Sequence, residues 1–136
     1  MNQVQIGKAI PILAILTAVG LVLFWIGFFT IGLAPDNPPT GYFAYEHSFP
    51  VPDITLSVVL LIGAVFCLKG HGQGTTILAA GGGALVFLGI LDMSFNFQNG
   101  MYSISVIDMI LNAFINLWCV IFGAAIVVKM MKVSRG

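Results

Sequence analysis

The sequence predicts an all-α membrane protein, a four-transmembrane-helix bundle with both termini in the cytoplasm and an ordered loop cap on the outer side. Three observations support this fold class. The 136 residues are 59% hydrophobic and only 7% charged, whereas about a quarter of the residues of a soluble domain are charged. There is room for about four apolar stretches near the 20 residues that a membrane helix needs. In a four-span arrangement all basic residues fall on one side of the membrane. We therefore expect residues 1–136 to form a single domain.

The first apolar stretch, residues 10–33, contains no charged residue and follows Lys8. Pro11 lies near its start, where the missing N–H group of proline is tolerated. The stretch is longer than the 7–15 apolar residues of a typical signal peptide. We expect it to be the first transmembrane helix rather than a cleaved leader.

The segment from Ala34 to Pro52 contains five of the six prolines and neither Lys nor Arg. Proline removes a backbone donor and restricts the residue before it, so the segment cannot be one continuous helix. Its Tyr and Phe side chains suit the headgroup level of a membrane. We expect an ordered cap on the outer surface, followed by Asp53 as the N-cap of the second helix.

The second and third spans are predicted at residues 54–68 and 75–91, joined by a glycine-rich turn. Small residues four apart in the third span, such as Ala79 with Gly83 and Ala80 with Ala84, would let a neighbouring helix approach closely. We interpret this stretch as a helix-packing surface.

A polar connection, residues 92–102, leads to the fourth span, predicted at residues 103–128. In this span Asp108, Asn112 and Asn116 recur every four residues and therefore share one helix face. Polar groups at this depth are expected to face the bundle interior. Two interpretations stay open: hydrogen bonds between helices, or a polar cavity that opens to the outer side.

The charges predict the orientation of the helices. The basic residues are Lys8, Lys69, Lys129, Lys132 and Arg135. The acidic residues are Asp36, Glu46, Asp53, Asp92 and Asp108. Four spans place the two sets at opposite ends, and basic residues favour the cytoplasmic side. We expect a multi-pass protein of the cell membrane with cytoplasmic N and C termini.

Asp92 provides the main argument for a binding site. It is predicted at the C-terminal end of the third span, where the helix dipole disfavours a negative charge. It therefore needs a partner: His47, a protonated carboxyl group, an amide or hydroxyl donor, or a bound cation. We expect the following residues to converge on one ligand site: Tyr45, Glu46, His47, Asp92, Asn96, Gln98, Asp108, Asn112 and Asn116.

This set of residues is compatible with three functions. The first is an extracytoplasmic acidic and aromatic pocket for a small ligand or cation, in a binding or transport module or an accessory subunit of a membrane complex. The second is a membrane-embedded enzyme acting on a lipid, quinone or isoprenoid-like substrate at the outer leaflet. Glu46, His47 and Asp92 would then be the candidate catalytic acids and bases. The third is a structural subunit whose polar residues only hold helices together.

The sequence also limits cofactors and partners. Glu46, His47 and Asp92 are candidate ligands for a divalent metal ion, although their spacing in the sequence matches no metal-binding motif. His47 and His71 are predicted on opposite sides of the membrane, so no haem is expected. Zero net charge gives no electrostatic basis for binding nucleic acid. Besides the lipid bilayer, a homo-oligomer or a larger membrane complex stays open.

Overall fold

The computed structural model describes residues 6–135, which form helices without any strand. Their helices are α1 (Ala9–Thr30), α2 (Tyr42–Glu46), α3 (Pro50–Leu68), α4 (Gln73–Gln98), the short 3-10 helix η1 (Met101–Ser103) and α5 (Val106–Ser134). Four segments are long and apolar enough to cross a membrane: α1, the segment Tyr42–Leu68 that contains α2 and α3, α4, and α5. The predicted all-α bundle with four candidate membrane helices is therefore confirmed.

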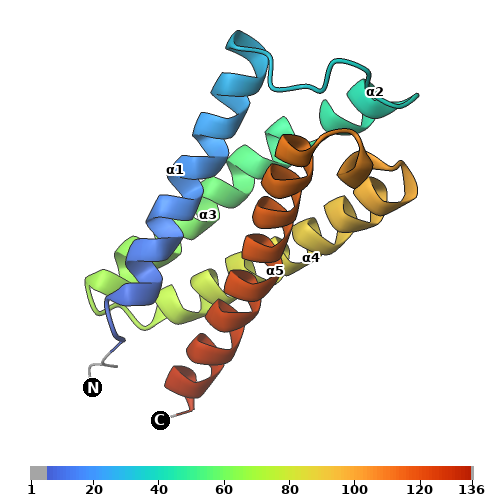
Figure 1. Cartoon of the computed structure of the whole chain (residues 1–136). Coiled ribbons are helices and arrows are strands. Elements are labelled where there is room, and N and C mark those ends of the chain that lie inside the picture. Colours follow the sequence, from blue (N-terminus) through green and yellow to red (C-terminus); the bar gives the residue numbers. More distant parts are fainter. Residues whose placement is uncertain (1–5, 136) are drawn as a thin grey trace.

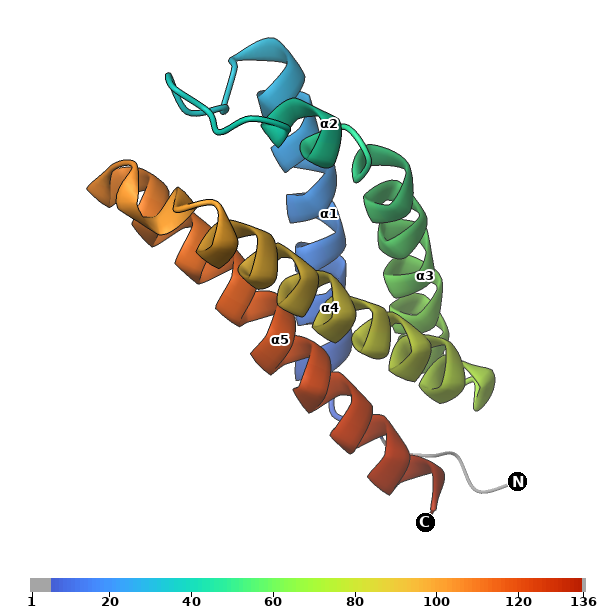
Figure 2. The same cartoon turned by 90° about the vertical axis from the view of Figure 1, so that its right-hand side faces the viewer.

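The long helices pack in the order α1, α3, α4, α5 (Figure 1). The pair α1 and α3 and the pair α4 and α5 diverge toward the end of the bundle that carries α2 (Figure 2). A side-chain hydrogen bond links the first and last helices, in which Trp118 Nε1 donates to Thr17 Oγ1 at 3.0 Å. The divergence leaves space among the helices at the α2 end.

Glycines bring α4 close to both of its neighbours. A Cβ atom added to Gly81 would lie 2.9 Å from Leu60 of α3, and one added to Gly82 would lie 2.8 Å from the carbonyl oxygen of Gly123 in α5. Gly83 has no heavy atom within 4 Å of the corresponding position. The third span is a packing surface as expected, but different small residues make the closest contacts. Ala80, Gly83 and Ala84, which the sequence suggested, are exposed.

The ends of all four long helices differ from the expected spans: α1 ends at Thr30, and α5 runs from Val106 to Ser134. Two of the differences change the position of a carboxyl group. The third long helix does not end at Leu91 but continues to Gln98, so Asp92 lies inside a helix rather than at its C-terminal end. The second long helix begins at Pro50, since proline is tolerated in a first turn. Phe49 occupies the N-cap and Asp53 lies within the first turn, so the prediction of Asp53 as N-cap is wrong.

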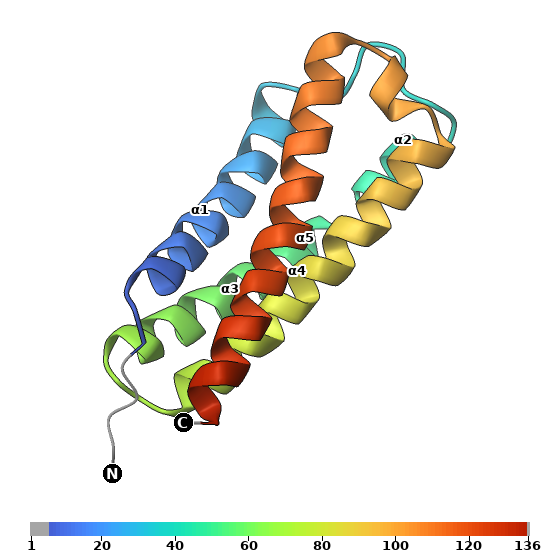
Figure 3. The same cartoon turned by 60° about the horizontal axis from the view of Figure 1, so that its bottom comes forward.

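The connections alternate between the two ends of the bundle. The start of α1, the turn between α3 and α4, and the end of α5 lie at one end (Figures 1 and 3). Lys8 precedes α1, Lys69 caps α3 and Arg135 caps α5, so the positive charge gathers there. At the other end lie α2, in the predicted cap segment, and the connection through η1. The cytoplasmic placement of the basic end stays a prediction.

Candidate ligand-binding site

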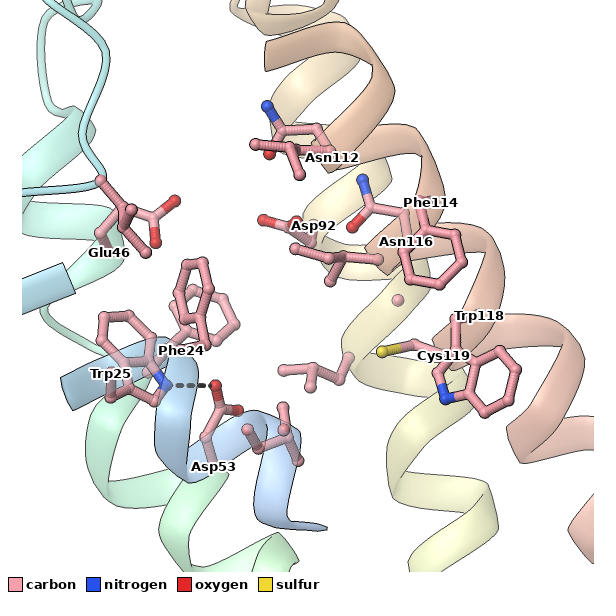
Figure 4. A pocket seen from close by; sticks show the side chains of 18 of the residues that line it. Phe24, Trp25, Glu46, Asp53, Asp92, Asn112, Phe114, Asn116, Trp118 and Cys119 are labelled. Carbon is pink, nitrogen blue, oxygen red and sulfur yellow. Dashed lines mark hydrogen bonds between the residues drawn. The ribbon is translucent and has the colours of Figure 1, made fainter. Parts of the chain in front are cut away.

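A cavity of about 600 Å³ lies between the diverging helices, at the α2 end (Figure 4). Every helix of the described chain contributes to its wall. Its carboxyl and amide groups belong to Glu46, Asp53, Asp92, Asp108, Asn112 and Asn116. Its aromatic side chains are Phe24, Trp25, Tyr42, Phe49, Phe114 and Trp118. No Lys, Arg or His is among the residues that line it, and most of the remaining lining is aliphatic.

Asp53 is the most deeply buried carboxyl group in this wall, with 5% of the residue exposed. It lies one turn into α3, which packs against α1. From α1, Trp25 Nε1 donates a hydrogen bond of 2.7 Å to Asp53 Oδ2. The other oxygen, Oδ1, is buried without a hydrogen-bond partner among the described residues. Only one of the two carboxyl oxygens of Asp53 is therefore hydrogen-bonded to another described side chain.

Asp92 has hydroxyl and amide partners. The hydroxyl of Tyr45 donates to Oδ1 at 3.2 Å, and Asn96 Nδ2, one turn later on α4, donates to Oδ2 at 3.2 Å. The Tyr45 ring stacks on Phe95, with the ring centroids 3.7 Å apart and the planes at 6°. Of the partners expected for Asp92, the structure provides hydroxyl and amide donors, and they hold the carboxyl group in place at the cavity wall.

The polar face of α5 lines the same cavity. At its start, Ser105 Oγ donates to Asp108 Oδ2 at 2.6 Å and accepts from the Asp108 N–H at 3.0 Å. Deeper in the helix, Asn116 Nδ2 donates to the hydroxyl of Tyr102 at 2.8 Å. Asn116 is 1% exposed, and its amide also lies in hydrogen-bonding contact with the carboxyl group of Asp92. Asn112 lies between Asp108 and Asn116 on the same face of α5 and also lines the cavity. The polar face of α5 therefore lines a cavity, and two of its residues, Asp108 and Asn116, also form side-chain hydrogen bonds.

Four expected site residues do not line the cavity: Tyr45, His47, Asn96 and Gln98. Tyr45 and Asn96 lie behind its wall, where they donate hydrogen bonds to Asp92. His47 is exposed, and its ring packs near Phe28 and Phe29 of α1, with centroids at 6.2 and 5.7 Å. Gln98 is also exposed and donates to Ser94 Oγ at 2.8 Å. Within residues 6–135, no three His, Cys, Asp or Glu side chains are grouped so that they could hold a metal ion. The structure therefore does not bring His47 together with Glu46 and Asp92.

Asp53 and Trp25 are absent from the set of site residues expected from the sequence. Asp53 follows Pro52, which suggested a cap, and Trp25 lies in an apolar span with no polar neighbour in sequence. A signal was present, because a carboxyl group entering an apolar span and an indole N–H within another both require partners. However, no pattern of neighbouring residues indicates that Trp25 and Asp53 are partners.

The arrangement combines carboxyl groups, aromatic rings and aliphatic walls. Carboxyl groups without a basic neighbour favour a positively charged ligand. Aromatic faces attract cations as well, and aliphatic walls accommodate an apolar body. Comparisons of this chain with protein-family models, with curated proteins and with solved structures find no match.

Proposed function

We propose that this chain binds a small organic cation with an apolar body, as a binding or transport module or as an accessory subunit of a membrane complex. One observation carries the proposal: four carboxyl-bearing residues line the cavity, and no basic residue does. Removing carboxylates from water is costly unless an opposite charge or hydrogen-bond donors compensate. A bound cation supplies that charge.

The size and chemistry of the cavity support an organic cation rather than a bare metal ion. Its volume of about 600 Å³ falls within the range of roughly 300–1,000 Å³ that is typical of small-molecule sites. A metal ion would need several ligands close together, and the described residues contain no such group of three. The carboxyl groups instead lie on separate walls, with apolar surface between them (Figure 4).

The charge distribution supports a location in the cell membrane with the cavity in its outer half. The basic residues lie at the end opposite α2, and basic segments favour the cytoplasmic side. On this basis both termini are cytoplasmic and the acidic cavity faces the exterior. The ligand would reach the cavity from outside or from the outer leaflet.

The second candidate is a membrane-embedded enzyme that acts on a lipid, quinone or isoprenoid-like substrate. Its specific support is the position of Glu46, whose carboxyl group points into the cavity toward the side where Asp92 lies (Figure 4). Two carboxyl groups facing each other across an apolar cavity could donate and accept a proton on a bound substrate. This function would favour a neutral apolar ligand over a cation.

The first experiment compares a cationic with a neutral probe of the same skeleton. Binding of 4-phenylbutylammonium and of 4-phenylbutanol to the protein in lipid nanodiscs is measured by isothermal titration calorimetry, with empty nanodiscs as background. A hydrogen bond to a charged group contributes about 1.5–3 kcal/mol. We therefore expect the ammonium compound to bind at least about tenfold more tightly than the alcohol.

Two variants of equal charge connect this binding to the cavity. Asp53→Asn removes a carboxylate from the cavity wall, and we expect it to weaken binding of 4-phenylbutylammonium by about tenfold or more. Asp36→Asn removes a carboxylate from the exposed loop between α1 and α2 and should leave binding unchanged. Equal affinity for the two probes would reject the cation-binding proposal and favour the enzyme.

A further inference from the structure

We infer that the cavity opens sideways into the lipid between α1 and α5, and that its ligand is an amphiphilic amine of the bilayer whose hydrocarbon chain occupies this opening. The inference rests on the proposed cation binding and specifies the apolar body and the source of the ligand. It comes from the exposed residues of the cavity wall, the packing of α1 and α5, and the height of the opening.

The exposed residues among those that line the cavity mark where it meets its surroundings. All of them are apolar: Leu16, Gly20, Leu33, Leu111 and Phe114. Leu16, Leu111 and Phe114 are each more than half exposed, whereas the carboxyl-bearing residues of the wall are buried or half-buried. Contiguous exposed apolar surface is typical of contact with a membrane. We call the four residues that lie in helices, Leu16 and Gly20 of α1 with Leu111 and Phe114 of α5, the lateral opening.

The packing of the helices leaves this opening uncovered. In the described chain α1 packs against α3, and α5 packs against α4, but α1 and α5 do not pack closely against each other. They are linked by the hydrogen bond from Trp118 to Thr17, near the end of the cavity that lies away from α2. Both helices still line the cavity, so it extends between them toward the outside of the bundle.

The lateral opening lies at the depth of the hydrocarbon. Gly20 is near the middle of α1 (Ala9–Thr30), which contains no charged residue, and is about 15 Å from the Thr30 end at 1.5 Å per residue. Phe114 lies about 12 Å from the start of α5 on the same basis. The hydrocarbon core of a bilayer is about 30 Å thick. A ligand that enters here must therefore already be dissolved in the membrane.

An apolar wall connects the carboxyl groups with the lateral opening. Trp25 of α1 donates its hydrogen bond to Asp53, and the cavity-lining residues of α1 continue from Phe24 down to Leu13. They are apolar except Thr17, whose hydroxyl is occupied by the Leu13 carbonyl. This wall is about 18 Å long. An ammonium group beside the carboxyl groups would therefore have its hydrocarbon chain along α1, and a long chain would continue through the opening into the lipid.

Photolabelling tests where the chain lies. The probe is dodecylammonium with a diazirine in the middle of its chain, added to the protein in lipid nanodiscs, and the labelled residues are mapped by mass spectrometry of peptides. An excess of 4-phenylbutylammonium separates bound probe from probe that is merely dissolved in the lipid. With this competitor at about ten times its Kd, we expect labelling around the lateral opening to fall about tenfold. Labelling of Ile121, which is exposed on α5 outside the cavity, should not change.

Two phenylalanine variants test the lateral opening itself. Gly20 and Gly83 are both exposed, and a Cβ atom added to either has no heavy atom within 4 Å, so both variants should fold. Gly20→Phe places a ring in the opening, and we expect it to weaken binding of dodecylammonium in calorimetry by about tenfold or more. The shorter 4-phenylbutylammonium should lose less affinity. Gly83→Phe lies outside the cavity and should leave both affinities unchanged.

The outcomes separate this inference from the proposed function. Suppose that 4-phenylbutylammonium binds more tightly than 4-phenylbutanol, but that the labelling sensitive to the competitor falls on the loop around Leu33 and Pro35 or is absent. The lateral opening then does not hold the chain, and cation binding stands. If 4-phenylbutylammonium binds no more tightly than the alcohol, the proposed function itself is wrong. If Gly20→Phe does not fold, as judged by circular dichroism and gel filtration, labelling of the unchanged protein still decides.

Discussion

At the scale of single residues, the hydrogen bond between Trp25 and Asp53 joins the first two long helices inside an apolar region. Both partners need it, because an indole N–H and a carboxyl oxygen lose their hydrogen bonds to water on burial. The bond also orients the carboxyl group, because it holds Oδ2 at 2.7 Å from Trp25 Nε1, while Oδ1 is buried without a hydrogen-bond partner among the described residues. Trp25 thus positions one of the carboxyl groups that line the cavity.

Removing the indole N–H tests this pair. In Trp25→Phe the Oδ2 of Asp53 loses its partner, so neither carboxyl oxygen is hydrogen-bonded to another described side chain. We expect the free energy of unfolding to fall by about 2 kcal/mol. Trp118→Phe is the matched control. It removes the bond to Thr17, whose hydroxyl still donates to the Leu13 carbonyl at 2.8 Å, so the loss should be below about 1 kcal/mol.

The measurement for both variants is unfolding in mixed detergent micelles, followed by circular dichroism. Similar losses for the two tryptophan variants would show that the Asp53 carboxyl group does not depend on Trp25.

At the scale of helices, α4 is the central element, because it packs against α3 on one side and α5 on the other. Successive residues of a helix point about 100° apart, so the neighbours Gly81 and Gly82 can serve two different partners. Gly81 meets Leu60 of α3, and Gly82 meets the backbone of Gly123 in α5. Such close approach of backbones is how helices associate in a membrane, where burial of apolar surface gives no advantage.

Alanine substitutions along this run should therefore differ sharply. Gly82→Ala places a Cβ 2.8 Å from the Gly123 carbonyl oxygen, and we expect it to lower the free energy of unfolding by about 1–3 kcal/mol. Gly83→Ala meets no atom within 4 Å, so alanine's better helix propensity should stabilise the protein by up to about 1 kcal/mol.

Thermal unfolding in detergent, followed by circular dichroism, measures both alanine variants. If Gly82→Ala is as well tolerated as Gly83→Ala, α4 and α5 are not as close as the structure places them.

At the scale of the whole molecule, the charges divide between the two ends of the bundle. The fold places the basic residues before α1, between α3 and α4, and at the end of α5, while α2 and the cavity lie toward the other end. This division predicts that the α2 end faces outward. It also keeps positive side chains away from the carboxyl groups of the cavity.

Labelling with a membrane-impermeant maleimide tests the orientation. Thr40→Cys lies in the exposed segment before α2, and Ser134→Cys is exposed at the end of α5. In intact cells we expect Thr40→Cys to be labelled and Ser134→Cys only after the membrane is permeabilised. The native Cys67 and Cys119 are buried, so the unchanged protein serves as background. The reverse pattern would place the cavity on the cytoplasmic side.

Properties that depend on local composition followed from the sequence alone. Apolar stretches of sufficient length predicted four membrane helices, and the spacing of Asp108, Asn112 and Asn116 correctly predicted one helix face. The prolines predicted a break between the first two spans, where α2 lies. Each of these inferences needs only residues that are close together in sequence.

The site depended on packing between distant segments. Trp25 and Asp53 are 28 residues apart, and Tyr45 and Asp92 are 47 apart. Whether α4 stopped at Leu91 or continued to Gln98 also decided whether Asn96 could reach Asp92. A buried polar group must find a partner, but the sequence states only that need. The packing of the helices determines which partner each buried polar group finds. It brought Tyr45 to Asp92 and Trp25 to one oxygen of Asp53, and it placed His47 outside the cavity.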